Sequence, residues 1–377
     1  MRIALNLIAL RPESQAGVER FARSLLGSLR LSEQIKLIIH TRSEVSPEII
    51  LGKEFIQNHT ATFLSRWKCN STFSRLFIEM VWLSFRTYFF DTVFSINNFG
   101  PIFGKKEQTR VVVIHDVWFL DDEFNGQHLK KYLFALLIKL QLNSTARVVT
   151  VSEFSRKAIS EKLKVSTNKI TVIPNCLPPD PELQIDKSYS EELESKLVNK
   201  TKKFFLMVGS DRPNKNIFLA VKAYVIYAQS CSNPLALRVV GTFSESFKSK
   251  LLSVIPDDLA MDFLVAGYVD DNDYRVLLRN SVGLIFPSLY EGFGIPVIEA
   301  MNVGKRVLIS KGTVCEEIAG DCGVVVDGTN ERSISRGLKN LGTDFEGKFS
   351  ATCISRSDCF KNCGELGKLL QDLLENT

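Results

Sequence analysis

Long apolar runs are what this chain of 377 residues most clearly lacks. No run reaches the roughly 18 apolar residues that a membrane-spanning helix requires. The most apolar helix-like stretch, residues 132–142, is interrupted by Lys139. The opening MRIALNLIAL is too short for a signal peptide and lacks a cleavage region, so we expect a first β-strand there. The pattern favours a cytoplasmic protein.

Metal ligands are also scarce. The chain has 4 histidines, and its 8 cysteines fall at irregular spacing, which indicates reduced thiols rather than a disulfide framework. Cys353, Cys359 and Cys363 are close in sequence, but no histidine is near them, so scattered thiols are the simpler interpretation. The acidic stretch at 269–274, VDDNDY, is better explained as the N-cap of a helix than as a metal-binding motif. We expect neither a metal nor another cofactor.

Two nucleotide-binding signatures are missing as well. The first loop, RPESQAGVER, lacks the G-x-G-x-x-G fingerprint, and no P-loop pattern occurs, which argues against a nicotinamide or flavin enzyme and a P-loop NTPase. Positive charge is present but uneven, because residues 1–175 hold 24 Lys and Arg against 15 Asp and Glu. Such a basic half can attract nucleic acid, anionic lipid or phosphorylated substrates, or can be a solvated face without a partner. No nucleic-acid motif accompanies it, so we expect no nucleic acid.

Strand-like and helix-like patterns alternate along the chain, which predicts parallel sheets covered by helices. The first series of strand-like runs lies at 35–40, 92–96, 111–116, 147–152 and 170–175. A stretch rich in proline and charge follows Asn175 and reads as a linker. The second series lies at 203–210, 235–242, 262–269, 282–287 and 306–310. We predict an α/β protein of two Rossmann-like, doubly wound domains, 1–175 and 176–362, facing a central cleft.

Residues 287–301, PSLYEGFGIPVIEAM, are the most informative part of the sequence. A strand-like run precedes a Gly-Phe-Gly turn, and a helix-like run follows with Pro296 where a first helical turn tolerates proline. Backbone N–H groups at such a helix start can bind an anion or a ring of hydroxyls. Glu291 and Glu299, eight positions apart, bracket the turn. Two carboxylates beside it suit a polyol attached to a phosphate.

This stretch resembles the E-x7-E signature of retaining glycosyltransferases of family four. Other stretches similar to that family lie at residues 1–26, 114–120, 148–175 and 263–310. The resemblance implies the GT-B fold, with an N-terminal acceptor domain and a C-terminal nucleotide-sugar donor domain. It also implies that a C-terminal helix, at about 363–377, packs back onto the first domain.

The resemblance assigns roles to the two carboxylates and the loop between them. Glu291 would act on the donor sugar as a catalytic residue, and Glu299 would bind the ribose hydroxyls. Backbone N–H groups would hold the sugar and the phosphate. The donor-binding loop implied in this way contains Gly292, Phe293, Gly294 and Ile295.

Cations for a diphosphate lie in a second loop, VGSDRPNKN at 208–216. Lys215 matches the family, whereas Arg212 is shifted from the commoner place and Asn214 stands where an arginine is frequent. Both cations suit a diphosphate leaving group, and the alternative is two solvated loop cations. Tyr268 and Val269 are the candidates for packing against the nucleotide base.

Two residues of the N-terminal half complete the predicted site. Gly17 precedes a helix and is expected to approach the donor diphosphate, although the family often has a second glycine where this chain has Ala16. His115 ends the strand-like run VVVIHD and is placed by the resemblance at the catalytic centre. Asp116 is expected to order the loop. The alternatives are a plain helix start for Gly17 and a structural histidine for His115.

The resemblance implies a retaining hexosyltransferase, with GDP-mannose as the leading donor and a glycan or lipid-linked acceptor of a bacterial surface polysaccharide. Other donors (UDP-glucose, UDP-GlcNAc or UDP-galactose) remain open, as do a sugar-nucleotide epimerase and a non-catalytic glycan-binding subunit. Residues 61–90 mix cations with aromatics. Within them, residues 73–85 have the periodicity of a helix. This helix either packs in the core or makes a peripheral contact of the basic N-terminal half with the inner face of the plasma membrane.

Overall fold

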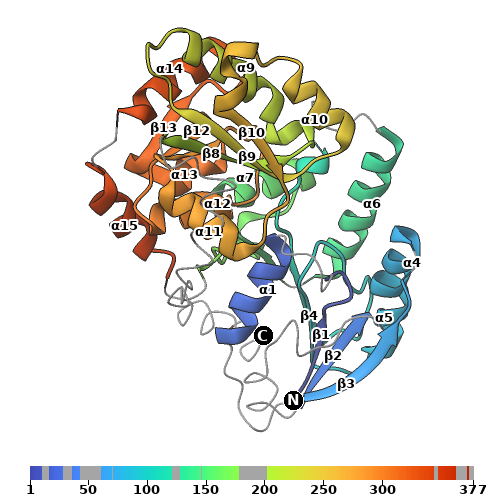
Figure 1. Cartoon of the computed structure of the whole chain (residues 1–377). Helices are drawn as coiled ribbons and strands as arrows, with labels where there is room; N and C mark the ends of the chain where they lie inside the picture. The colour runs from blue at the N-terminus through green and yellow to red at the C-terminus, as the bar shows by residue number, and fades with distance from the viewer. Residues whose placement is uncertain are drawn as a thin grey trace. The chain divides into compact units, whose positions relative to one another are not determined.

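The computed structural model describes residues 1–10, 17–28, 36–42, 61–69, 71–120, 128–145, 147–177, 202–343, 347–361 and 372. The chain divides into two compact units, the first made of Met1–Pro178 with Asn362–Thr377 and the second of Pro179–Lys361 (Figure 1). The linker expected after Asn175 lies mostly outside the described residues. The C-terminal helix expected at 363–377 lies outside them too, apart from Asp372.

The first unit is built on a parallel sheet of seven strands in the order β3-β2-β1-β4-β5-β6-β7. These strands are β1 (Arg2–Asn6), β2 (Lys36–Arg42), β3 (Ala61–Trp67), β4 (Thr92–Ser95), β5 (Thr109–Val113), β6 (Arg147–Thr150) and β7 (Ile170–Val172). The main helices are α1 (Gly17–Ser28), α4 (Thr72–Phe77), the π-helical turn η1 (Ile78–Trp82), α5 (Leu83–Arg86), α6 (His128–Ser144) and α7 (Glu153–Leu163).

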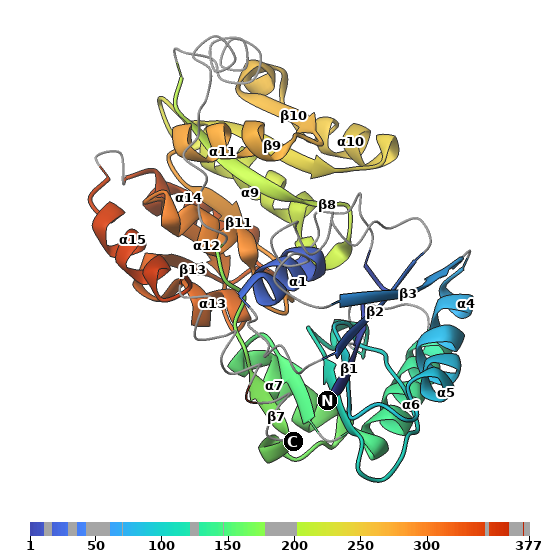
Figure 2. The same ribbon diagram turned by 90° about the horizontal axis from the view of Figure 1, so that it is seen from below.

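One face of this sheet carries an apolar core that several helices share. Val112 of β5 and Val148 of β6 pack with Ile138 of α6 and Met80 of η1 in a single buried cluster. Figures 1 and 2 show α1 on the opposite side of the sheet from α4, α5 and α6. Burial of both faces explains why the central strands are almost wholly apolar rather than alternating.

The second unit has a parallel sheet of six strands in the order β10-β9-β8-β11-β12-β13. Its strands are β8 (Phe204–Ser210), β9 (Ala236–Thr242), β10 (Phe263–Gly267), β11 (Leu284–Phe286), β12 (Val307–Ser310) and β13 (Gly323–Val326). Its α-helices are α9 (Ile217–Gln229), α10 (Glu245–Leu252), α11 (Asp271–Asn280), α12 (Ile295–Asn302), α13 (Val314–Ala319), α14 (Glu331–Gly342) and α15 (Ser350–Asp358).

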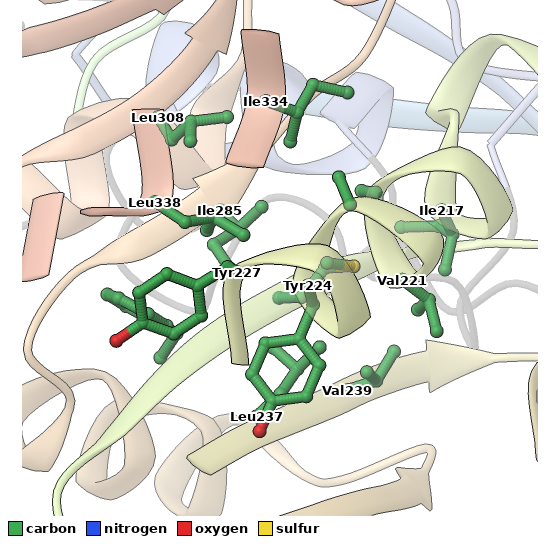
Figure 3. Packing of buried hydrophobic residues seen from close by; sticks show 14 of the residues in the cluster. Ile217, Val221, Tyr224, Tyr227, Leu237, Val239, Ile285, Leu308, Ile334 and Leu338 are labelled. Atoms are coloured by element: carbon green, nitrogen blue, oxygen red, sulfur yellow. The ribbon is translucent and has the colours of Figure 1, made fainter. Parts of the chain in front are cut away.

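Helices α9 and α14 cover one face of the second sheet and bury a large apolar cluster (Figure 3). Tyr224 and Tyr227 of α9 place their hydroxyl groups on the backbone of Leu235, at 3.0 Å from its carbonyl oxygen and 3.2 Å from its nitrogen. These bonds satisfy the only polar atoms that the two rings bring into the core. Burial also raises the pKa of Tyr224, so its hydroxyl stays protonated.

Each sheet has one point at which the strand order reverses, between β1 and β4 in the first and between β8 and β11 in the second. At β8, for example, the chain runs outward through β9 and β10 and then returns to β11 on the other side. In folds of this kind, the loops on the two sides of such a reversal diverge to opposite faces, and ligands bind at the carboxyl ends of the strands there. The fold thus singles out the loops after β8 and β11.

The fold class predicted from the sequence is confirmed, because both units are parallel sheets flanked by helices. The ten strand-like runs of the two series correspond to observed strands, with ends that differ by a few residues. Strands β3 and β13 were not predicted. The helix expected from the periodicity of residues 73–85 is confirmed as the consecutive helical segments α4, η1 and α5, and strand β3 precedes it.

Candidate functional site

Lys215 and Glu291 meet at the strand-order reversal of the second sheet. Lys215 ends the turn after β8 and Glu291 lies in the loop after β11, and the Lys215 Nζ to Glu291 Oε1 distance is 2.5 Å. Their side chains are 21% and 15% exposed, so the pair is accessible without being fully solvated. The Lys215 ammonium also lies 5.3 Å from the centre of the Phe286 ring, which supplies a cation–π contact.

Two asparagines fasten the loop of Lys215 to the loop of Glu291. The side-chain amide of Asn214 donates to the Tyr290 carbonyl at 3.0 Å, and the backbone carbonyl of Asn214 accepts from the Leu289 N–H at 2.8 Å. The Asn216 amide donates to the carbonyls of Pro287 and Gly328. Because these bonds hold the backbone on both sides of Lys215, the position of its ammonium is fixed by neighbours that the sequence motif did not reveal.

The Gly-Phe-Gly turn delivers the start of helix α12 to the same place. Gly294 is the N-cap of α12 with φ of 99°, a conformation that favours glycine, and Pro296 occupies the first turn as expected. A Cβ on Gly294 would lie 3.1 Å from the Cys315 sulfur, so even alanine would be tight there. The first N–H groups of α12 have no partners within the helix, which makes this end a site for an anion.

The other residues of this loop differ in burial and therefore in the groups that a ligand can contact. The Phe293 ring is buried and packs edge-on against Phe360 at 5.7 Å, so only its backbone is suited to contact a ligand. Gly292 is buried, and Ile295 is half-buried as the first residue of α12. Glu299 is half-buried in the second turn of the same helix. Glu299 and Glu291 therefore flank the start of one helix, as their spacing predicted.

The remaining predicted donor residues lie on neighbouring loops of the second unit. Arg212 is exposed at the beginning of the turn that ends with Lys215. Tyr268, which is 69% exposed, and the half-buried Val269 follow β10. The N-cap expected in VDDNDY is confirmed, because the Asp270 carboxylate accepts from the Asp273 N–H at 2.8 Å at the start of α11.

Two glycines, Gly209 and Gly241, face each other at the paired carboxyl ends of β8 and β9. Gly241 has φ of 142°, and a Cβ there would lie 1.8 Å from the Gly209 carbonyl oxygen. A Cβ on Gly209 would lie 2.6 Å from Ile217, the first residue of α9. A side chain at Gly241 would collide with the backbone of β8, and one at Gly209 would collide with the start of α9. Sequence reasoning missed this contact, because a lone glycine gives no sign of its neighbour.

His115 lies in the first unit, after the carboxyl end of β5. The ring is buried, packs edge-on against Phe21 of α1 at 5.0 Å, and has Nε2 at 3.0 Å from the Ile96 carbonyl oxygen. That carbonyl only accepts, so Nε2 carries the proton and donates it. Burial lowers the pKa of His115 to about 4, which keeps the imidazole neutral. Asp116 accepts from the Trp118 N–H at 3.3 Å and orders the loop as expected.

Gly17 is exposed as the first residue of α1. The strand before it ends at Asn6, whose buried amide bridges to Ser95 and Phe99 across the strand-order reversal of the first sheet. The structure thus brings Lys215, Glu291 and the α12 start together in the second unit. It places Gly17 and His115 at the carboxyl edge of the other sheet.

Within the described ranges, no three His, Cys, Asp or Glu side chains gather closely enough to hold a metal ion. Metal independence stays a prediction. Among the helices that the structure describes, none is both long and apolar enough to cross a bilayer.

Comparison with known families accounts for both units. The profile described as Glycosyltransferase Family 4 matches residues 16–180, and the profile described as Glycosyl transferases group 1 matches residues 188–354. The chain belongs to glycosyltransferase family four. The E-x7-E loop that resembles this family follows β11, at the strand-order reversal of the second sheet.

Curated relatives of this family-four protein carry mannosyltransferase names. The O-antigen chain mannosyltransferase RfbU of Salmonella typhimurium is 26% identical over 238 residues, covering 62% of this chain and 61% of the relative. The O-antigen chain mannosyltransferase B of Escherichia coli is 27% identical over 248 residues, covering 63% of this chain and 62% of the relative. The matches thus span about three fifths of the length of these relatives.

Solved structures show the same GT-B fold over the full length. WaaG, described as a glycosyltransferase involved in lipopolysaccharide biosynthesis, superposes with a TM-score of 0.73 at 15% identity, covering 100% of both chains. Anabaena HepE, solved in complex with UDP and glucose, gives a TM-score of 0.70 at 14% identity, again over 100% of both chains. At these identities the likeness concerns the fold.

Proposed function

We propose that this family-four protein is a retaining hexosyltransferase. It takes a hexose from a nucleoside diphosphate sugar and transfers it to a glycan or lipid-linked acceptor in the synthesis of a surface polysaccharide. Family membership supports glycosyl transfer, and the mannosyltransferase names of the curated relatives favour GDP-mannose as the donor.

The Lys215–Glu291 pair at the strand-order reversal is the observation that carries the proposal. A cation beside a helix start suits a diphosphate, and a carboxylate next to that cation suits the sugar attached to it. In the protein without substrate, the two charges neutralise each other. When the donor binds, its diphosphate competes for Lys215 and releases Glu291 towards the sugar.

The proposed reaction needs no covalent intermediate with the enzyme. The acceptor hydroxyl attacks the anomeric carbon on the face that the diphosphate leaves, the bond from that carbon to the phosphate oxygen breaks, and the departing phosphate takes the hydroxyl proton. Lys215 and the N–H groups at the start of α12 stabilise the negative charge on the leaving diphosphate. Glu291 stabilises the positive charge that develops on the sugar. His115, neutral and held by Ile96, contributes shape and hydrogen bonding rather than proton transfer.

A donor panel tests the proposal. The purified protein is incubated with GDP-mannose, UDP-glucose, UDP-GlcNAc or UDP-galactose, and nucleotide release is measured with and without a glycan acceptor. We expect turnover with GDP-mannose and an axial anomeric bond in the product, as in the donor, by proton NMR. Turnover with a different donor would correct the sugar alone. A product of inverted configuration would refute the retaining mechanism, and failure to bind or turn over any of these donors would refute the proposed transferase.

A further inference from the structure

Helices α4 and α5 expose a continuous row of aromatic side chains. Six large apolar residues between positions 72 and 89 are at least 39% exposed, and Phe73 and Phe89 reach 78% and 69%. The complete set is Phe73, Phe77, Trp82, Phe85, Tyr88 and Phe89. The opposite side of the same segment is buried through Leu76, Met80 and Leu83. The sequence left a choice between a core-packed helix and a lipid-facing one, and this segment has both kinds of face.

The π-helical turn η1 keeps this row on one side of the helix. Phe77 and Trp82 are five positions apart, a spacing that would point them in different directions on a regular α-helix. The Leu83 N–H bonds to the Ile78 carbonyl, an i to i−5 bond that accommodates one extra residue in the turn. The exposed row Phe73, Phe77, Trp82 and Phe85 therefore continues across the irregular turn, and Tyr88 and Phe89 follow in the turn after α5.

Helix α6 adds a second exposed apolar row beside the first. Tyr132, Leu133, Leu136 and Leu140 are between 46% and 67% exposed. Its buried side, through Ile138, enters the same core cluster as Leu76 and Met80 of the first segment. Figures 1 and 2 both show α6 next to α4 and α5. We call these two exposed rows, residues 73–89 and 132–140, the aromatic face.

Within the two segments that form the aromatic face, the exposed charged side chains have a single sign. Glu79 is the only acidic residue between positions 71 and 89, and it is 1% exposed with Arg75 at 3.4 Å. Residues 132–144 contain no acidic residue at all. Arg86 and Lys139 are exposed within the two segments. The surface that these helices present is thus aromatic and cationic, and carries no exposed acidic residue of its own.

We propose that the aromatic face docks on the surface of an anionic lipid bilayer. Phenylalanine and leucine can enter the boundary between headgroups and acyl chains, tryptophan and tyrosine are suited to that boundary, and arginine and lysine attract anionic headgroups. A symmetric dimer through this face would oppose cation to cation, because a two-fold axis pairs a patch with itself. The charge pattern therefore favours lipid over a second copy of the chain.

Vesicle co-sedimentation of the full-length protein tests the docking of the aromatic face. The assay contains no donor or acceptor, so its result is independent of the proposed activity. The vesicles contain phosphatidylcholine either alone or with phosphatidylglycerol. We expect binding to the anionic vesicles at about 50 mM NaCl and release at about 500 mM, because salt screens the cationic contribution. Vesicles of phosphatidylcholine alone should bind more weakly.

A matched pair of triple variants locates the contact. F73S/F77S/F89S should lower the partition onto anionic vesicles about tenfold or more, because three exposed aromatics no longer enter the interface. L252S/M261S/I354S removes three exposed apolar residues of the second unit and should bind like the wild type. All six positions are exposed, and circular dichroism with thermal unfolding verifies that the variants fold.

Three outcomes would overturn the proposal. The first is no binding to anionic vesicles at low salt. The second is equal binding of the wild type and F73S/F77S/F89S. The third is a dimer in solution, measured by light scattering, that these substitutions dissociate, since the aromatic face would then be occupied by a second copy.

Discussion

A double-mutant cycle on Lys215 and Glu291 separates their contribution to stability from their role in turnover. With side chains 21% and 15% exposed, the pair lies between exposed ion pairs, which contribute about 0.2–1 kcal/mol, and buried pairs, where loss of one partner costs about 3–5 kcal/mol. We therefore expect Lys215→Met to lower the unfolding free energy by about 1–3 kcal/mol, because Glu291 keeps its charge without its partner. Lys215→Met with Glu291→Gln should recover most of that loss.

Turnover should respond differently from stability. Removing one group that stabilises the leaving diphosphate typically costs about 10²–10³ in rate. We expect each single variant to lose at least that much turnover, and the double variant to lose little more than the worse single one, because groups acting as one unit are not additive. Urea unfolding and nucleotide release from the donor, measured on the same preparations of the full-length protein, give the two quantities.

The pair Lys222–Glu331 is a matched control within the same unit. Its Nζ–Oε1 distance is also 2.5 Å, but its side chains are 40% and 30% exposed. We expect a coupling of about 0.2–1 kcal/mol for that pair and wild-type turnover in both of its single variants. Near-wild-type turnover of Lys215→Met would refute the assigned role in donor binding. Strictly additive stability losses at Lys215 and Glu291 would refute their coupling.

Four further predictions follow from the structure. Asn214→Ala should cost about 1–3 kcal/mol of stability and slow turnover, because the Tyr290 carbonyl loses its donor. Unchanged kcat and KM would show that the hydrogen bond from Asn214 to Tyr290 does not position Lys215. Gly241→Ala should lower the unfolding free energy, measured in urea, by about 3 kcal/mol or more. The control Gly312→Ala, at φ of 73° with nothing within 4 Å of its Cβ, should cost about 1 kcal/mol. Equal costs would contradict the collision of the Gly241 Cβ with the Gly209 carbonyl of β8. Burial lowers the pKa of His115 to about 4, so its contribution to stability is complete above its unfolded pKa of about 6.5 and is lost as the pH falls towards 4. His115→Asn should therefore flatten the pH dependence of the unfolding free energy between pH 6.5 and 5 by up to about 1.4 kcal/mol per pH unit. An unchanged slope would contradict the buried neutral ring. Turnover should survive EDTA, and a complete loss that manganese restores would show that the acidic stretch at 269–274 was interpreted wrongly.

Much of the fold follows from local patterns. Strand-like runs of five to eight residues separated by helical stretches predicted most strands of both sheets, because a parallel strand buried on two faces is almost wholly apolar. Strand β3, ATFLSRW, escaped prediction because its polar ending resembles the surrounding polar sequence. The π-turn within 78–82 was also invisible, since a single inserted residue leaves the apolar composition unchanged.

The sequence by itself determined the chemistry available at the candidate site. It named Lys215, the carboxylates Glu291 and Glu299, and the glycine turn that begins α12. It also predicted that Pro296 would stand in the first helical turn and that the stretch at 269–274 would cap a helix, and the structure shows both, with Asp270 as the N-cap of α11. These features depend on neighbours within a few positions along the chain, and short-range geometry is what a sequence pattern records.

Only the tertiary structure decided which of these groups meet. Lys215 and Glu291 are 76 positions apart and pair because β11 returns beside β8, a choice made by the order of strands in the sheet. The same holds for Asn214, which reaches Tyr290, and for Gly241, which admits the Gly209 carbonyl. It holds again for the aromatic face, because the sequence could not show which side of α4 and α5 the core would bury. Contacts between segments far apart in the chain form only when the sheet closes, so no local pattern specifies them.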